Sequence, residues 1–192
     1  MRAIPTPWHT IGPFFPRTFF HDGDNDLNRG AARGQRIVLR GRVLEEGGAP
    51  CVNAVLEAWQ ADAEGRFAHP LDPEGRDADP GFLGWGRAWT DEDGRFEFRT
   101  IRPGGYDDPA GRRAPHVNIM VIGSGIMGRL QTTLFFPDEP ANLADPVLLS
   151  LPAPLRPRLI AAPDSEEKGV PAFRLDLLLH DAAGGETPFF ED

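Results

Sequence analysis

The clearest strand pattern of the chain lies in residues 101–136, which read IRPGGYDDPAGRRAPHVNIMVIGSGIMGRLQTTLFF. A loop rich in glycine and proline carries Tyr106, the only tyrosine, and leads into a strand that begins at His116. Residues i and i+2 of a strand point to the same face, so His116 and Asn118 project together. A tyrosine and a histidine directed at one place are typical of a site for a hard cation such as Fe(III), whereas an amide is a poor ligand for it. The stretch therefore predicts a metal site that is either working or degenerate.

Alternating apolar and polar residues on both sides of this stretch predict further short strands. They cover residues 35–43, 52–60, 85–90, 95–100 and 172–179, and an Asp-Gly pair at 93–94 supplies a tight hairpin turn. Residues 69–84 are expected to form a loop, and residues 137–163 to hold one or two helical turns near 143–149. We predict an all-β fold, an antiparallel β-sandwich of seven to nine short strands with long Pro/Gly-rich loops. Trp59, Trp85 and Trp89 are expected in its core.

The composition limits the class of protein. With 192 residues and 40% hydrophobic residues, the chain is long enough for one domain with a substantial core. A net charge of -9 argues against nucleic-acid binding, which needs a basic surface. No apolar run approaches the roughly 20 residues of a membrane span. The single cysteine, Cys51, and the lack of an apolar leader predict a cytoplasmic protein without an intrachain disulfide.

The first 35 residues show neither a strand period nor a helix period. Prolines at positions 5, 7, 13 and 16 favour an extended path, and the same segment contains Trp8 and four phenylalanines. Such a segment must bury its aromatic side chains, either on its own domain or on another chain. We predict that residues 1–35 are an N-terminal arm that packs on a partner subunit and that residues 36–192 form one β-sandwich domain.

Several motifs, taken in order, resemble those of one enzyme family. They are LEAWQADAEGRF at residues 56–67, TDEDGRF at 90–96, IRPG at 101–104 and APHVN at 114–118. TIGPF at residues 10–14 and GETPFF at 185–190 extend the match to nearly the whole chain. Each motif alone is weak, but in this order they resemble the intradiol ring-cleavage dioxygenases, which are non-haem Fe(III) enzymes built on a β-sandwich.

The resemblance implies where a metal site would lie. Catalytic members of the family hold iron with two tyrosines and two histidines, and these positions correspond to Phe67, Tyr106, His116 and Asn118 here. Phenylalanine has no donor atom, and an amide cannot supply the ligand that Fe(III) prefers. We therefore expect a vestigial site, with no metal and no catalytic residue in this chain alone. Arg113 matches an arginine that stabilises charge on the substrate in catalytic chains, so it is a candidate pocket arginine.

Within the family, the chain is most similar to the non-catalytic α subunits of hetero-oligomeric members. This implies a homologous β subunit as partner, in an αβ protomer of a higher oligomer, with Fe(III) bound by the β subunit. It also implies an oxidoreductase complex that cleaves protocatechuate with O2 in aromatic catabolism. Groups around Thr10, Gly12 and Pro13 would help to line the partner's substrate pocket. Neither nucleic acid nor a membrane is an expected partner.

Two alternatives belong to different classes of protein. One is a self-sufficient intradiol dioxygenase that uses Tyr106, His116 and ligands that the motifs do not identify. The other is a transthyretin-like β-sandwich that acts as a binding module without catalysis. The absence of tyrosine elsewhere in the chain argues against the first alternative. The irregular N-terminal arm and the full-length match argue against the second.

Overall fold

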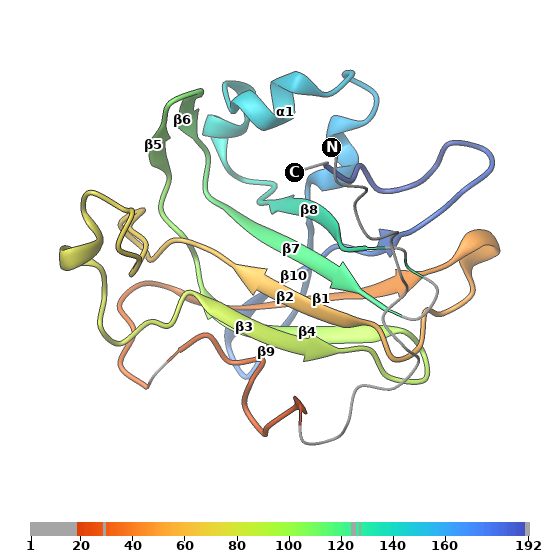
Figure 1. Ribbon diagram of the computed structural model, residues 1–192, viewed down its shortest axis with the longest axis horizontal. Helices are drawn as coiled ribbons and strands as arrows, with labels where there is room; N and C mark the ends of the chain where they lie inside the picture. Colours follow the sequence, from red (N-terminus) through yellow and green to blue (C-terminus); the bar gives the residue numbers. More distant parts are fainter. Residues whose placement is uncertain (1–18, 29, 124–125, 127, 191–192) are drawn as a thin grey trace, which may run out of the picture.

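Two β-sheets pack face to face with the hydrophobic core between them (Figure 1). The computed structural model describes residues 19–28, 30–123, 126 and 128–190. One sheet has the order β3-β2-β7-β8, and the other has the order β11-β1-β10-β9 with β4 paired to β1. The predicted all-β sandwich is confirmed.

The strands have the following bounds. The first sheet contains β2 (Val55–Trp59), β3 (Trp85–Trp89), β7 (His116–Ile122) and β8 (Leu130–Phe135). The second contains β1 (Arg36–Leu44), β4 (Arg95–Ile101), β9 (Ala162–Glu167), β10 (Val170–Arg174) and β11 (Leu177–Leu178). A separate hairpin is made by β5 (Tyr106–Asp108) and β6 (Gly111–Arg113).

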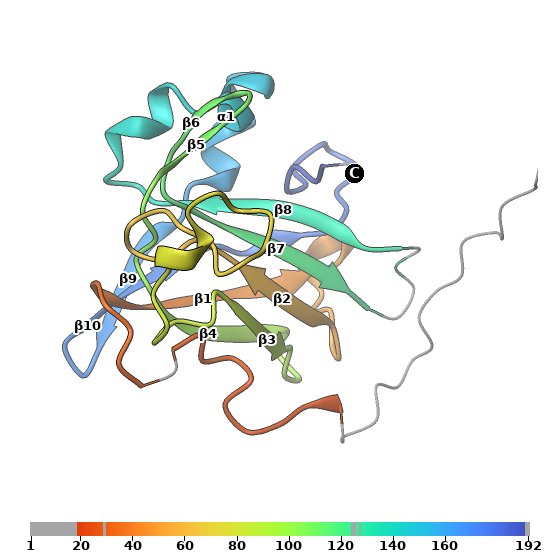
Figure 2. The ribbon, with the colours of Figure 1, turned by 60° about the vertical axis from the view of Figure 1, so that its left-hand side comes forward.

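Helical structure is short and lies mainly between β8 and β9. The α-helix α1 is Pro146–Ser150, and 3₁₀ turns occur at Glu46–Gly48, Gly75–Asp77, Pro140–Leu143 and Arg156–Leu159. Figures 1 and 2 both show α1 beside the β5–β6 hairpin, at one end of the sandwich. This end of the molecule therefore brings the hairpin, α1 and the start of β7 together.

The second sheet is mixed, whereas the sequence predicted antiparallel strands. β1 is antiparallel to β4 but runs parallel to β10 and β11. The predicted strand 172–179 is also divided, because Leu175 and Asp176 leave the ladder opposite Gly41. A Cβ on Gly41 would lie 1.9 Å from the Leu175 carbonyl oxygen, and the Asp176 carboxylate accepts the Arg42 backbone N–H at 2.9 Å. A side chain thus replaces a backbone partner at the break.

The core follows the two-residue period of the strands. In β7, Val117, Ile119 and Val121 are buried between the sheets. His116 and Asn118 have the opposite parity, so they lie on the outer face of the first sheet. His116 is nevertheless only 3% exposed, because the β5–β6 hairpin and Tyr106 cover that end of the strand. The same period that builds the core therefore directs these two side chains to the outside of the sheet.

The prediction that the three tryptophans belong to the core is wrong. Trp59 and Trp89 are each 38% exposed, and Trp85 is partly buried. They share the outer face of β2 and β3 with Glu57 and Arg87, whose side chains form an ion pair at 2.6 Å. Aromatic side chains on this face stack on their neighbours and on Arg87. The alternation of the strands was predicted correctly, but the side of the sheet that faces the core was not.

Part of the N-terminal segment packs on its own domain. Leu27 is fully buried in the core, the Phe20 ring lies 4.1 Å from the Trp89 ring, and the Arg87 guanidinium lies 4.0 Å from the centre of the Phe19 ring. Residues 1–18 lie outside the described residues, so packing of the arm on a partner stays a prediction.

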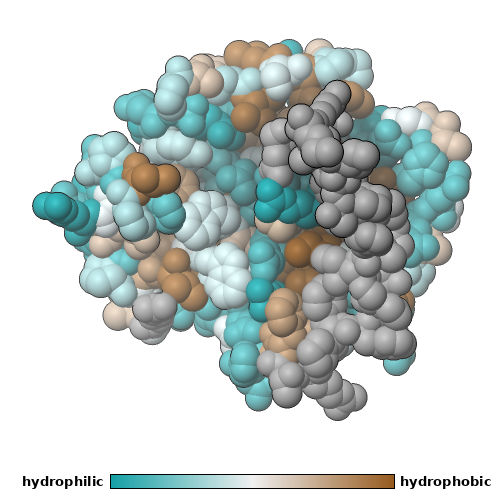
Figure 3. All heavy atoms as spheres, viewed as in Figure 1, coloured by the Kyte–Doolittle hydropathy of each residue, from teal (hydrophilic) through white to brown (hydrophobic). Residues whose placement is uncertain are grey.

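On the face shown in Figure 3, hydrophobic side chains lie in several small patches, one of them over the end that carries α1, and hydrophilic side chains separate these patches. Leu149 of α1 is 48% exposed. The described residues contain no helix with the length and hydrophobicity of a membrane span.

Candidate functional site

Tyr106 and His116 lie next to each other although they come from different elements. Tyr106 begins β5 and pairs with Arg113 across the hairpin, which turns the phenol toward the start of β7. The Tyr106 Oη and His116 Nε2 atoms are 3.5 Å apart, at the outer limit of a hydrogen bond. The structure therefore brings together the two residues of the predicted site that can act as metal ligands.

The His116 ring is held in one orientation. Its Nδ1 donates to the Ala114 carbonyl oxygen at 2.6 Å, so the lone pair is on Nε2 and points to Tyr106. Burial, and then the positive charge of Arg113, lower the pKa of His116 to about 4. The imidazole is consequently neutral near pH 7.

Tyr106 is the hydrogen-bond donor of the pair. Burial of its ring raises the pKa of the phenol, and the nearby Arg113 charge only partly opposes this effect. The phenol is therefore protonated near pH 7 and can donate to the free lone pair of His116. The two side chains can therefore form one long hydrogen bond with each other, while His116 Nδ1 is bonded to Ala114.

Asn118 is bound to the neighbouring strand. Its Oδ1 accepts a hydrogen bond from the Thr133 hydroxyl at 2.9 Å, across the β7–β8 register that pairs the two residues. The amide thus has a structural partner on the sheet face.

Phe67 fills the space next to Tyr106 with an aromatic ring. Its ring stacks on Trp59, at 5.8 Å between centroids and 7° between planes. It meets Tyr106 edge-on at 5.1 Å. The Phe67 backbone N–H is anchored by the Asp72 carboxylate at 2.6 Å. The predicted position is therefore occupied by a packed hydrocarbon ring.

Arg113, the candidate pocket arginine, is 9% exposed and forms an ion pair with a buried carboxylate. Its Nε donates to Asp145 Oδ2 at 2.9 Å, and the same oxygen accepts the Ala114 N–H at 2.9 Å. Its guanidinium carbon lies 6.0 Å from the centre of the Tyr106 ring. The charge of Arg113 is thus directed to Asp145, in the wall behind the Tyr106–His116 pair.

Sequence reasoning missed Asp145. It is fully buried, and its Oδ1 accepts the N–H groups of Val147 and Leu148 at the start of α1. The signal in the sequence was Asp followed by Pro and then an apolar run, which is typical of a helix N-terminus. That signal predicts the cap, but not the bond to Arg113.

Fe(III) does not fit the residues that are present. Tyr106 and His116 offer two donors, Phe67 offers none, and the Asn118 oxygen is bonded to Thr133. Among the described residues, no group of three or more His, Cys, Asp and Glu side chains could hold a metal ion. Thr10, Gly12 and Pro13 lie outside the described residues, and their role in a partner's pocket stays a prediction.

The chain is similar to known proteins in family, sequence and structure. A family model described as dioxygenase matches residues 11–181. The protocatechuate 3,4-dioxygenase alpha chain of Burkholderia cepacia is 34% identical, with 97% of this chain and 96% of that chain covered. The beta chain from the same organism is 40% identical over 76% of this chain, which spans 66% of its length. The dioxygenase domain of a carbohydrate-binding fusion from Streptomyces sp. SirexAA-E is 29% identical with a TM-score of 0.61, covering 93% of this chain and 100% of that one.

Proposed function

Because the chain belongs to the intradiol ring-cleavage dioxygenase family, we propose that it is the non-catalytic α subunit of a protocatechuate 3,4-dioxygenase. The observation that carries the proposal is the end-to-end match to an alpha chain, together with Phe67 and Asn118 at two ligand positions of the family. The complex would cleave protocatechuate with O2 to 3-carboxy-cis,cis-muconate. Fe(III) would be bound by the homologous β subunit.

In this proposal the chain shapes the pocket and does not hold the reacting centre. Of the predicted arm, residues 1–35, the part before residue 19 would pack on the β subunit, since Phe20 and Leu27 pack on the chain's own domain. Thr10, Gly12 and Pro13 would help to line the substrate pocket of the β subunit. The αβ protomer would assemble into a higher oligomer in the cytoplasm. The contact between Tyr106 and His116 and the buried Arg113–Asp145 ion pair support a structural role for these residues.

The test compares the chain purified alone with the chain co-expressed with a β-type partner. Iron content and O2 uptake with protocatechuate are measured for both. We expect the lone chain to be free of iron and inert and the complex to contain iron and consume O2. Stoichiometric iron and O2 uptake by the lone chain would refute the proposal.

A second candidate is a self-sufficient intradiol dioxygenase. Two observations favour it, namely the higher identity to a beta chain and the adjacent Tyr106 and His116 donors. If it holds, Tyr106→Phe should abolish both iron binding and O2 uptake in the lone chain. Family membership favours either enzyme hypothesis over the binding-module alternative.

A further inference from the structure

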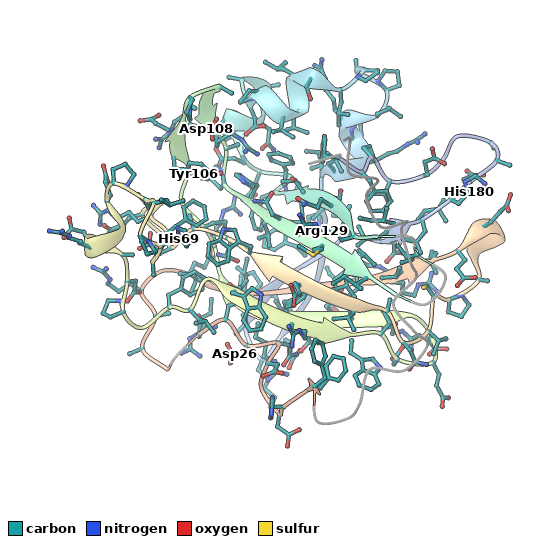
Figure 4. The ribbon with its side chains drawn as sticks, in the orientation of Figure 1. Asp26, His69, Tyr106, Asp108, Arg129 and His180 are labelled. Atoms are coloured by element: carbon teal, nitrogen blue, oxygen red, sulfur yellow. The ribbon has the colours of Figure 1, made fainter. Side chains whose placement is uncertain are left out.

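A cleft of about 680 Å³ opens on the outer side of the Phe67 and Tyr106 rings. We call it the aromatic cleft, and its walls include Trp59, Phe67, His69, Leu71 and Tyr106. Figure 4 shows Tyr106 and His69 at the same end of the sandwich, from the β5 strand and from the loop after β2. Tyr106 belongs both to the cleft wall and to the Tyr106–His116 pair, whereas neither His116 nor Arg113 lines the cleft.

The walls expose large apolar and aromatic side chains that have no role in the core. Trp59 is 38% exposed, and Leu71 at the tip of the loop is 86% exposed. His69 meets the Trp59 ring edge-on at 6.4 Å between centroids. Half-exposed aromatic rings in a concavity are common at the centres of binding surfaces, because they bury much area at low entropic cost.

The charge of the cleft selects the type of occupant. One guanidinium, that of Arg112, lines the cleft. Four carboxylates also line it, those of Glu64, Asp72, Glu74 and Asp107. Arg66, just outside, pairs with Glu64 and Glu74, and Arg112 pairs with Asp107. Arg33 also pairs with Glu64, but it is shared with a further carboxylate, Asp79. Five carboxylates against three arginines leave an excess of two negative charges. This excess repels an aromatic carboxylate and attracts an organic cation, which aromatic ring faces also bind.

We propose that the aromatic cleft is a docking site for a guanidinium or ammonium side chain of the partner subunit. The inference rests on the proposed function, since it assumes that the chain works in a hetero-oligomer. Trp59 would supply the aromatic surface, and Asp107, whose side chain is 86% exposed, would supply charge at the rim. The cleft would then contribute to subunit recognition and not to binding of the aromatic substrate.

The first experiment uses the chain alone, so it is independent of the partner. N-acetyl-L-arginine amide is titrated into 15N-labelled protein, and the indole N–H signals are followed by NMR, with benzoate as the anionic probe. We expect the cation to shift the Trp59 signal with a dissociation constant of about 10 mM. The cation should bind more weakly as the salt concentration is raised, and benzoate should not shift the signal. Binding of benzoate in preference, or no binding of the cation, would overturn the proposal.

Matched variants locate the site. Trp59→Leu, followed through the backbone amide signals of Gly65 and Gly105 in the cleft wall, should weaken binding of the arginine probe about tenfold. Trp89→Leu should leave it unchanged, because Trp89 has the same 38% exposure on the same sheet face but lies outside the cleft. Asp107→Asn tests the charge without removing packing, and it should weaken the probe about threefold. Equal effects of the two tryptophan variants would refute the assigned position.

The second experiment measures the affinity of the co-expressed complex by dilution and size-exclusion chromatography. Trp59→Leu and Asp107→Asn should each weaken assembly, the first by about tenfold or more. If the probe binds the lone chain but both variants assemble as well as the wild type, the proposal that the cleft binds a side chain of the partner subunit is overturned. Failure of the wild-type chain to assemble with any β-type subunit would instead refute the proposed function, while the probe titration would still decide whether the cleft binds cations.

Discussion

Replacing Asp145 by alanine should be among the most destabilising single changes at this end of the molecule. Its carboxylate is fully buried and accepts four hydrogen bonds. Oδ2 binds Arg113 Nε and the Ala114 N–H, both at 2.9 Å. Oδ1 binds the N–H groups of Val147 and Leu148 at 2.9 and 3.2 Å. One side chain therefore joins the N-terminus of α1 to the strand that presents the candidate site.

The magnitude follows from the groups that lose their partner. Breaking a buried ion pair by removing one member costs roughly 3–5 kcal/mol, because the remaining charge stays buried. Loss of a helix N-cap costs about 1 kcal/mol. Both terms share one carboxylate and are not additive, so we expect about 4 kcal/mol in total. Asp138→Ala is the control, because Asp138 pairs with Arg102 at 2.9 Å but is 66% exposed; its loss should cost at most about 1 kcal/mol.

The assay is urea unfolding followed by tryptophan fluorescence. With a denaturant slope of about 2 kcal/mol per molar, Asp145→Ala should lower the unfolding midpoint by about 2 M. The double variant Arg113→Leu/Asp145→Leu should recover part of this loss, because it leaves no unpaired charge. If Asp145→Ala and Asp138→Ala lowered the midpoint equally, the argument from burial would be refuted.

Three further predictions concern the same end of the molecule. Burial lowers the pKa of His116 from 6.5 to about 4, so between these pH values the imidazole binds a proton only in the unfolded chain. The free energy of unfolding should therefore fall by up to about 3 kcal/mol as the pH drops from 6.5 to 4. Urea unfolding at each pH measures this dependence, and His116→Gln should flatten it. Phe67→Tyr combined with Asn118→His should raise the iron content of the lone chain measured by atomic absorption, and an unchanged content would show that the site cannot be restored by its donors alone. Gly65→Ala should lower the melting temperature more than Gly169→Ala, because both have positive φ but only at Gly65 would the Cβ meet a carbonyl oxygen, at 2.3 Å.

The strands could be predicted where one face is buried, because burial imposes a two-residue period on the sequence. β7 was predicted at residues 116–122 and is found there. β5 and β6 have three residues each, too few for a pattern, and β9 reads APDSEE and has no buried face. These elements depend on neighbours that the local sequence does not identify.

The sequence by itself determined the chemistry available in this protein. It established the absence of a donor at Phe67, the amide at Asn118 and the shared face of His116 and Asn118, since residue type and strand period are local properties. Only the tertiary structure decided that β1 runs parallel to β10, that Trp59 and Trp89 face outward and that Asp145 holds Arg113. These features depend on which sheet faces meet and which distant segments pack together, and periodicity is the same for either face of a strand.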